Sequence, residues 1–555
     1  MRRGGGFTAW FVAAAILLCL FGQLGALGFT GPDEPRYAWI TRAMARTGDW
    51  VTPRLYGQPW FEKPILYYWT AAVGFRLHFP AEWAARLPSA FAALAAAVAI
   101  GWLAAKHYSG KATSLDSPAL LAPLIFASSV AGIGFARAAT PDMLFAASIT
   151  LAMAAIAAVY SQAGALRGVA SSADENPPAR GRDFFALALF GAFLGLGVLA
   201  KGPAAVILAG GAILLWALAT RQWRAALRAL HPVAVAAFCV VALPWYVLCA
   251  LRNPDFLRVF IWQHNFERYL TPMFHHPQPF WFFGPIALLA LVPWTILLWP
   301  AFREGLRLWR EKSWTHSPGL FFACWAVFPV LFFSFSDSKL PSYILPSIPP
   351  LALICAIAGN RACERSRAMA LVISTGIGIA WIGLAAGASA WAKKIPWDAL
   401  NYDYAPHAVP IWTWMAIGAA ILLALVLIFF GLGRRTGMVV GLCALAVVLA
   451  LEFANIQILP AVDPLYSARY HARFMSHDLH PDRIFTFDLA RSWDYGLAFY
   501  FGRQLPEWQP SDPRPALVLT NPAGFQQITR LGRFRGVLDE PEKGVLYVPV
   551  EPAPQ

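Results

Sequence analysis

Charged residues at the ends of apolar runs are the feature of this sequence most able to do chemistry. Asp33 and Arg36 follow the first apolar run in "GFTGPDEPRYAWI", and Glu62 and Lys63 lie in "WFEKPILYYW". Five more candidates occur in "GFARAATPDM", "LAKGPA" and "SDSKLPSYILP": Arg137, Asp142, Lys201, Lys339 and Tyr343. Lysine and arginine suit a phosphate group, and carboxylates suit a hydroxyl, an amine or a metal.

Two interpretations of these residues are open. Each charge taken alone fits a snorkelling side chain that sets the depth of a helix end. The set as a whole favours one shared cavity, because proline fixes the backbone beside Lys63 and Lys339 in a specific shape that a solvated helix end does not need.

A metal site is a further candidate in the same region. Glu62 could bind zinc or manganese together with His264, His275 and His276, because imidazole and carboxylate are ligands of these ions. The alternative is that the histidines are interfacial residues of an aromatic loop. No other cofactor is expected: "GLGVLAKGP" has glycine after its lysine and lies in an apolar region, so it is not a nucleotide-binding phosphate loop.

The elements that must position these residues are membrane-spanning helices. The 555 residues are 58% hydrophobic and 13% charged, whereas soluble proteins carry about 25% charged residues. The formal charge of +14 comes from small basic groups between apolar runs. It therefore fits topology signals and contact with anionic membrane lipids better than binding to nucleic acid. The seven cysteines lie almost entirely in apolar segments, which argues against a disulfide framework.

About thirteen apolar runs are long enough to be predicted spans. They lie at residues 7–29, 82–105, 117–136, 141–161, 184–200, 203–220, 231–251, 280–300, 317–336, 342–359, 368–391, 409–431 and 436–459. The N-terminus and the even-numbered connections hold most of the arginine and lysine residues. The positive-inside rule therefore predicts a cytoplasmic N-terminus, and an odd number of spans places the C-terminus outside.

The chain divides into two predicted domains. Residues 1–460 form a transmembrane domain with long outer loops at 30–81 and 252–279, and the first loop holds a short helix that ends at Gly48. Residues 461–555 are less apolar. There "RIFTF", "PALVLT" and "GVLYVPV" are typical of strands and "AGFQQITRLG" of a helix, which predicts a small outer α/β domain.

A long stretch of the first outer loop carries a family resemblance. "GPDEPRYAWITRAMARTGDWVTPRLYGQPWFEKPILYYW" resembles bacterial membrane glycosyltransferases related to protein O-mannosyltransferases, and is most similar to the lipid A aminoarabinose transferases. "ARAATPDMLF", "GLGVLAKGP" and "SDSKLPSYILP" follow in the family's order, so the resemblance covers essentially the whole chain. It implies a polytopic α-helical fold of the GT-C type with a small periplasmic α/β domain at the C-terminus.

The resemblance also implies roles for the candidate residues. Asp33 matches the family's essential acid, and Asp142 is a second candidate catalytic residue. Lys63, Lys201 and Arg137 match cations for the lipid-linked phosphate. The predicted phosphate-binding set is completed by Arg36, Tyr343 and Lys339.

The implied reaction transfers 4-amino-4-deoxy-L-arabinose from undecaprenyl phosphate to a lipid A phosphate. The reaction would occur at the periplasmic side of a Gram-negative inner membrane. A monomer would catalyse it, and the product would confer polymyxin resistance. Two alternatives stay open: a related transferase that uses galacturonic acid or a hexose, and a lipid transporter or flippase. A transporter should show repeat symmetry or paired broken helices in its two halves, and the sequence shows neither.

Overall fold

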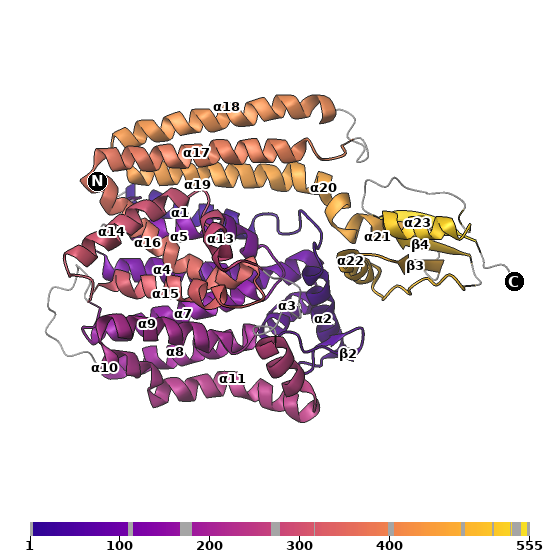
Figure 1. Ribbon diagram of the computed structural model, residues 1–555, viewed down its shortest axis with the longest axis horizontal. Helices are drawn as coiled ribbons and strands as arrows, with labels where there is room; N and C mark the ends of the chain where they lie inside the picture. The colour runs from indigo at the N-terminus through magenta and orange to yellow at the C-terminus, as the bar shows by residue number, and fades with distance from the viewer. Residues whose placement is uncertain are drawn as a thin grey trace.

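The computed structural model is a bundle of apolar helices with a small α/β unit at one end (Figure 1). It describes residues 4–108, 115–166, 180–267, 278–315, 317–397, 405–478, 483–512, 515–532, 534 and 545–551. In these ranges eight helices are long and apolar enough to cross a membrane, or up to ten if each of two bent pairs is one span. Three shorter apolar helices lie at Phe7–Phe21, Ala204–Thr220 and Pro318–Ser334. The polytopic helical fold is therefore confirmed, and the count of thirteen spans stays a prediction.

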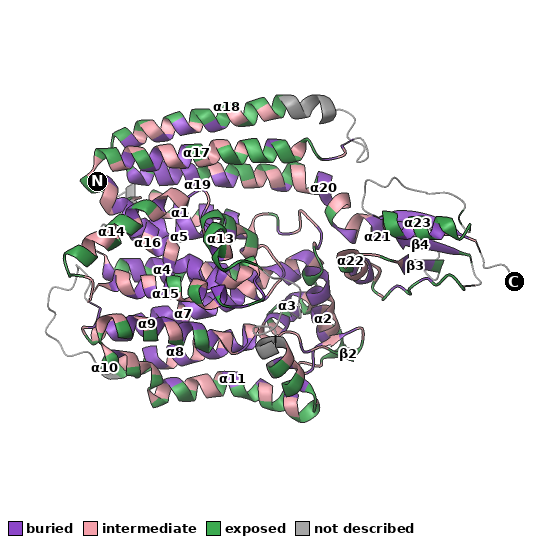
Figure 2. Cartoon of the chain, viewed as in Figure 1, coloured by how far each residue is buried: buried purple, intermediate pink, exposed green. Residues whose placement is uncertain are grey.

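The first half of the chain supplies one group of helices of the bundle. They are α1 (Gly4–Phe21), α4 (Ala81–His107), α5 (Pro118–Ala127), α6 (Val130–Ala136), α7 (Asp142–Gln162), α8 (Arg180–Lys201), α9 (Ala204–Thr220), α10 (Trp223–Ala226), η1 (Leu227–Leu230) and α11 (Pro232–Arg252). Alanine-rich α7 is almost entirely buried, because its small side chains let neighbouring helices approach closely. Figure 2 shows this burial at the centre and exposed residues along α11 and α18.

The second half continues with η2 (Arg258–Glu267) and then a further series of helices. These are η4 (Phe280–Phe282), α13 (Phe283–Ala290), η5 (Thr295–Leu297), α14 (Leu298–Arg310), α15 (Pro318–Ser334), η6 (Pro341–Ser347), α16 (Ile348–Arg365), α17 (Arg367–Ala392), α18 (Ala405–Leu432), α19 (Thr436–Phe453), η8 (Ala454–Ile458) and α20 (Leu459–Tyr466). Helices α17, α18 and α19 lie together along one side of the bundle (Figure 1).

Residues 30–81, which the sequence predicts to be the first outer loop, fold as two helices joined by a hairpin. Helix α2 (Asp33–Thr47) ends at Gly48, whose φ of 72° is the left-handed conformation that glycine adopts most easily. The predicted short helix is thus confirmed. Strands β1 (Arg54–Leu55) and β2 (Gln58–Pro59) pair antiparallel, and α3 (Leu66–Arg76) packs against α2 and α4.

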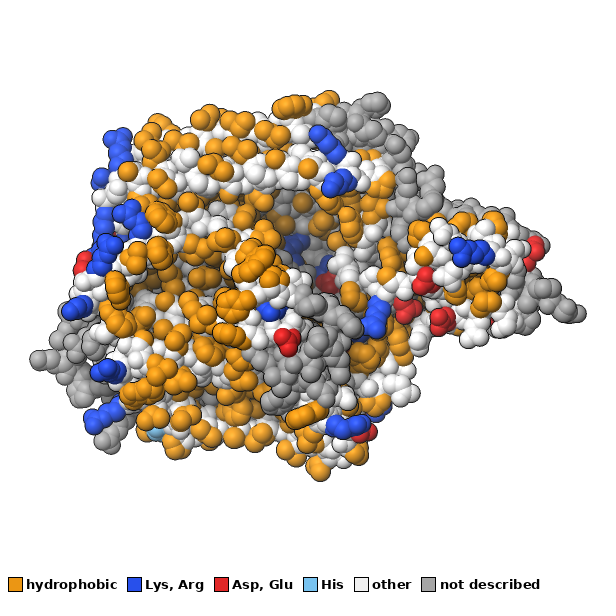
Figure 3. All heavy atoms as spheres, in the orientation of Figure 1, with side chains coloured by type: hydrophobic (Ala, Val, Ile, Leu, Met, Phe, Trp, Pro, Cys, Tyr) orange, Lys and Arg blue, Asp and Glu red, His pale blue; other side chains and the backbone are white. Residues whose placement is uncertain are grey.

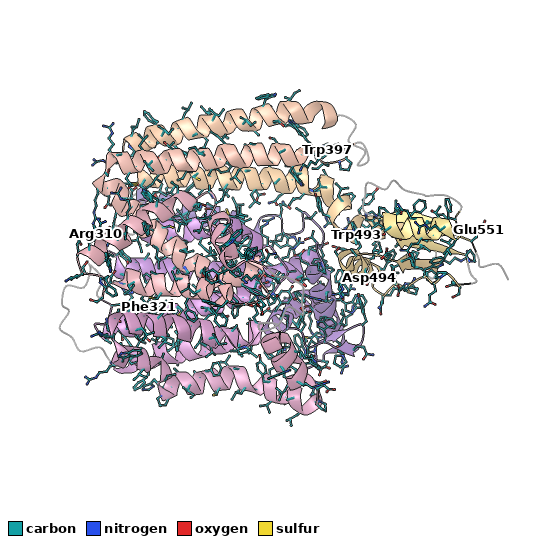
Figure 4. All side chains as sticks on the ribbon, in the orientation of Figure 1. Arg310, Phe321, Trp397, Trp493, Asp494 and Glu551 are labelled. Atoms are coloured by element: carbon teal, nitrogen blue, oxygen red, sulfur yellow. The ribbon has the colours of Figure 1, made fainter. Side chains whose placement is uncertain are left out.

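The C-terminal unit is a three-stranded sheet with flanking helices. Strand β4 (Ala516–Thr520) is central, parallel to β3 (Ile484–Phe487) and antiparallel to β5 (Leu546–Val550). The helices are α21 (Ala468–Asp478), α22 (Arg491–Phe501) and α23 (Pro522–Arg530). The predicted strands and helix are confirmed, and the boundary at residue 460 stays a prediction. Trp493 of α22 lies where this unit meets the bundle, and Arg310 lies at the far end (Figure 4).

Candidate active site

One buried ion pair fixes the turn that begins α2. The Glu34 carboxylate accepts hydrogen bonds from Nε and Nη2 of Arg86, at 3.0 and 2.7 Å. It also accepts the backbone N–H groups of Thr30 and Ala139, at 2.9 and 2.8 Å. Burial alone would raise the pKa of Glu34, but Arg86 and these N–H groups hold it below its usual value. The pair therefore locks the turn before α2 against the turn before α7.

Arg86 has further partners in the same turn. Its Nη1 donates to the carbonyls of Leu24 and Leu27, at 2.6 and 2.7 Å, and its Nη2 donates to that of Gly28 at 2.9 Å. Sequence reasoning missed Arg86, although an arginine inside the apolar run of α4 is the kind of signal that could have identified it.

Asp33 lies at the start of α2 with its carboxylate beside Arg36. Nη2 of Arg36 is 2.5 Å from Asp33 and 3.0 Å from Glu62, so one guanidinium bridges both acids. Burial raises the pKa of Asp33 above its usual value, Arg36 opposes the rise, and Glu62 adds to it. Water still reaches this side chain, which is 54% exposed, so the rise is smaller than full burial would produce.

Aromatic rings hold the Arg36 guanidinium in place. Its central carbon lies 5.1 Å from the ring centre of Tyr37, 5.5 Å from that of Trp60 and 5.8 Å from that of Tyr495. These are cation–π distances. Tyr495 belongs to α22 of the C-terminal unit, and nothing in its local sequence indicated that it would reach the first outer loop.

The loop before α3 adds a second cation to the group. Lys63 lies 3.5 Å from Glu62, and each of the two side chains is 15% exposed. Lys63 and Asp142 are both close enough to Asp33 to affect its pKa, in opposite directions. Residues from the first outer loop and from the start of α7 therefore share one site.

Helices α7 and α8 contribute a third acid and a third cation. Asp142 begins α7 and forms an ion pair with Lys201, the last residue of α8. Gly202 has a φ of 94°, which lets the chain turn sharply before α9 and leaves Lys201 at the corner. The Lys201 ammonium lies 5.2 Å from the ring centre of Tyr343 in η6. The structure thus brings Tyr343 to this group as well.

We call Asp33, Arg36, Glu62, Lys63, Asp142 and Lys201 the Asp33 cluster. Its three acids and three cations balance in charge, and Asp33 is its most exposed carboxylate, at 54% against 15% for both Glu62 and Asp142. Figure 3 shows a hollow in one face of the bundle with Lys, Arg, Asp and Glu side chains at its floor. A phosphate can bind to the cations of such a cluster, while Asp33 stays available to the group that the phosphate carries.

Arg137 and Lys339 bind other partners. Arg137 donates to the carbonyls of Gly22 and Gln23 and, at 2.7 Å, to the side chain of Asn455. Lys339 donates to two carbonyls, those of Gln278 at 3.0 Å and Ser336 at 2.5 Å. The described contacts do not bring either residue to the Asp33 cluster, so their phosphate-binding role stays a prediction.

The predicted metal ligands fall largely outside the described residues. The side chain of His264 and all of His275 and His276 lie outside them, and Glu62 is paired with Arg36 and Lys63. Within the described ranges, no group of three or more His, Cys, Asp and Glu residues could hold a metal ion. The metal site therefore stays a prediction.

Comparison with protein families gives one match over the first half of the chain. Residues 11–260 match the family described as dolichyl-phosphate-mannose-protein mannosyltransferase.

Three relatives share the name undecaprenyl phosphate-alpha-4-amino-4-deoxy-L-arabinose arabinosyl transferase. The Edwardsiella ictaluri protein is 33% identical over 63% of this chain, and the alignment covers 59% of that relative, less than two thirds of its length. The Erwinia tasmaniensis protein is 30% identical over 71% of this chain and 68% of its own. The Sodalis glossinidius protein is 30% identical over 76% of this chain and 70% of its own.

Two solved structures share the fold over nearly the whole chain. ArnT from Cupriavidus metallidurans bound to undecaprenyl phosphate superposes with a TM-score of 0.76 at 22% identity, covering 98% of both chains. Its apo state gives a TM-score of 0.75 at 23% identity, covering 99% of both. The small C-terminal unit is thus included in the shared fold.

Proposed function

We propose that this chain, which belongs to the family of undecaprenyl phosphate-alpha-4-amino-4-deoxy-L-arabinose arabinosyl transferases, transfers 4-amino-4-deoxy-L-arabinose from undecaprenyl phosphate to a phosphate of lipid A. The observation that carries the proposal is the Asp33 cluster. It brings Lys63 and Lys201 together with Asp33, an acid that a ligand can reach because its side chain is 54% exposed. The names of the relatives support the choice of sugar and of lipid carrier.

In the proposed reaction the bond between sugar C1 and the donor phosphate oxygen breaks. Its electron pair stays on that oxygen, which leaves as undecaprenyl phosphate, and a lipid A phosphate oxygen forms the new bond to C1. Lys63 and Lys201 stabilise the negative charge that develops on the leaving phosphate, because they are held in a cavity of low dielectric. No nucleotide takes part, since the donor arrives already activated.

Asp33 is proposed to act on the sugar and not as a general base. An acceptor phosphate is already ionised at neutral pH, so little deprotonation is needed. The Asp33 carboxylate would stabilise the positive charge that develops at C1 and orient the acceptor. Arg36 bridges Asp33 to Glu62 and so fixes its position.

The remaining predictions belong to the same proposal. The enzyme acts as a monomer in the inner membrane of a Gram-negative bacterium, with its N-terminus cytoplasmic and the cluster and C-terminal unit periplasmic. It requires no cofactor. Zinc or manganese held by Glu62, His264, His275 and His276 would be an additional requirement. Measuring transfer activity after a chelator removes the metal, and again after the metal is returned, tests this.

Mass spectrometry of lipid A tests the proposal most directly. Cells that contain the gene should carry aminoarabinose adducts on lipid A phosphate and resist polymyxin, and cells that lack it should do neither. Adducts with the mass of galacturonic acid or a hexose would indicate that the protein transfers that sugar instead of the proposed one. Unchanged lipid A in both strains would contradict the proposed reaction.

A further inference from the structure

A cavity of about 610 Å³ lies at the end of the bundle opposite the Asp33 cluster. It is lined by residues 163–165, Gln222, Ala225, Trp223 and three arginines, which are Arg221, Arg224 and Arg228. Helix α7 begins at Asp142 of the cluster and ends at Gln162 beside this cavity. Because α7 has 21 residues, the Asp33 cluster and this cavity lie about 30 Å apart, which is the thickness of the hydrocarbon layer of a membrane. In Figure 1 α10 correspondingly lies at the opposite end from α2 and the C-terminal unit.

Hydrogen bonds between separate connections build the cavity. Nε2 of Gln222 donates to the carbonyl of Ala165 at 3.2 Å and to that of Thr315 at 3.1 Å. The hydroxyl of Tyr160 donates to the carbonyl of Ala226 at 3.3 Å. The cavity wall is therefore tied to α7 and to the segment before α15, and it is not a loose surface loop.

Among the described residues, the charge that lines this cavity is positive and largely uncompensated. Its lining within the described ranges contains no acidic residue. Arg228 lies 3.5 Å from Asp183, whereas the exposed side chains of Arg221 and Arg224 form no ion pair with any residue that the structure describes. Two guanidinium groups that have no acidic partner among the described residues, beside a concave surface, are the chemistry that binds a phosphate.

The rim of the cavity is apolar. Trp223, Leu227 and Leu230 are exposed on α10 and η1, immediately before the apolar helix α11. A tryptophan at this position is typical of the boundary between hydrocarbon and water. Figure 3 shows basic side chains along this end of the bundle and apolar side chains next to them. A phosphate free in water would use only the arginines, whereas a lipid would use the arginines and the apolar rim together.

We propose that this cavity binds the phosphate headgroup of an anionic phospholipid, with the acyl chains passing over Leu227 and Leu230. Basic pockets between helices at a membrane surface are suited to such headgroups. The proposal concerns binding on the face opposite the Asp33 cluster, and it does not depend on the sugar transferase activity.

The test compares two double variants that remove the same charge. Arg221→Gly with Arg224→Ala removes both guanidinium groups from the cavity. Glycine suits position 221 because its φ of 59° is left-handed. Arg303→Ala with Arg310→Ala is the control, since both residues are exposed on α14 and Arg310 lies at the same end of the bundle (Figure 4).

Native mass spectrometry of the full chain in detergent micelles measures the binding, with phosphatidylglycerol as the anionic lipid and phosphatidylcholine as the neutral one. The wild type should prefer phosphatidylglycerol. The cavity variant should bind it about 25-fold more weakly, from about 5-fold for each arginine, and the control should stay within about 2-fold of the wild type.

Three results would overturn the proposal. They are unchanged binding in the cavity variant, an equal loss in the control, and full displacement of phosphatidylglycerol by inorganic phosphate at about 10 mM, which would indicate a small-anion site. If size-exclusion chromatography shows that the cavity variant is misfolded, the single substitution Arg224→Gln is tested in its place. An about 5-fold loss then supports the proposal, and no loss overturns it.

Discussion

At the scale of residues, Asp33 differs from the other two acids of the cluster in how much of it a ligand can reach. Glu62 and Asp142 are largely enclosed and paired with lysines, whereas 54% of the Asp33 side chain is exposed. Its contact with Arg36 leaves the second carboxylate oxygen available. An acid that is fixed on one side and open on the other is suited to meet a substrate.

Asp33→Asn should lower transfer by about 10²–10³-fold, because the amide keeps the shape but removes the negative charge that the reacting sugar needs. The turnover number for transfer to lipid A by purified protein measures this. Asp255→Asn is the control, since Asp255 is 74% exposed and, among the residues that the structure describes, pairs only with Arg258, at 3.3 Å. Near-normal transfer by Asp33→Asn would reject the proposed catalytic role of the Asp33 carboxylate.

As the pH is lowered, kcat/KM should begin to fall at a higher pH than it would if the essential group were an ordinary aspartate. Asp33 must be ionised, and burial raises its pKa above the usual 3.8. Arg36→Met removes the cation that opposes this rise, so the acid limb of kcat/KM should move to still higher pH. A limb that stays in place would mean that another group titrates. The effect on folding stability has the opposite direction. Because the pKa of the Asp33 carboxyl is raised in the folded protein, the folded state binds more protons than the unfolded state, and stability falls as pH rises from 3.8 through the raised pKa.

Lys63→Ala should lower kcat/KM for the lipid-linked donor by about 10²–10³-fold, because the leaving phosphate loses a cation in a cavity of low dielectric. Lys393→Ala is the matched control, since Lys393 is exposed just beyond α17. Kinetics at varied donor concentration measure both variants. Near-normal kinetics for Lys63→Ala would reject the phosphate-binding role.

At the scale of elements, the sequence predicted most of the cluster but not what holds it together. Asp33, Lys63 and Lys201 stand out because each is a charge at the end of an apolar run. Arg86 is also a charge in an apolar run, but its pairing with Glu34 could not be predicted, because the two are distant in sequence and only folding brings them together. Arg137 has the same local signal as Lys201, yet it binds carbonyls near Gly22. Local pattern thus identifies charged helix ends but not which of them share a cavity.

Glu34→Gln should destabilise the protein by about 3–5 kcal/mol, because it leaves the buried Arg86 guanidinium without its counter-charge. It should also slow transfer, since the Glu34–Arg86 pair aligns the turns that carry Asp33 and Asp142. Thermal unfolding in detergent measures the first effect. Asp255→Asn breaks an exposed pair and should cost no more than about 1 kcal/mol. Equal costs for the two variants would contradict the structural role of Glu34.

At the scale of the whole molecule, the C-terminal unit is joined to α2 and to the segment just after α1 by specific contacts. Nη2 of Arg42 in α2 donates to the carbonyl of Phe499 at 2.8 Å. Arg469 donates to the carbonyls of Gly25 and Ala26, at 2.9 and 3.1 Å, and to Asp463 at 3.0 Å. The sequence predicted the strands of this unit from three short runs that are typical of strands. It could not predict this docking, which depends on side chains more than 400 positions apart.

Tyr500 offers the cleanest test of whether that docking supports the site. Its hydroxyl donates to Glu82 at 2.8 Å and accepts the N–H of Phe29 at 2.9 Å, just before the turn that carries Asp33. Tyr500→Phe keeps the ring but leaves that N–H unpaired, at a cost of about 1–3 kcal/mol.

Amide hydrogen exchange at residues 25–34 should therefore become faster in Tyr500→Phe, and transfer should slow. Tyr466→Phe is the matched control, because Tyr466 is largely exposed at the end of α20. If exchange in Tyr500→Phe matches the wild type, or if the control changes as much, the C-terminal unit does not order the first outer loop. Faster exchange at residues 25–34 in Tyr500→Phe alone would make this unit part of the machinery that positions Asp33.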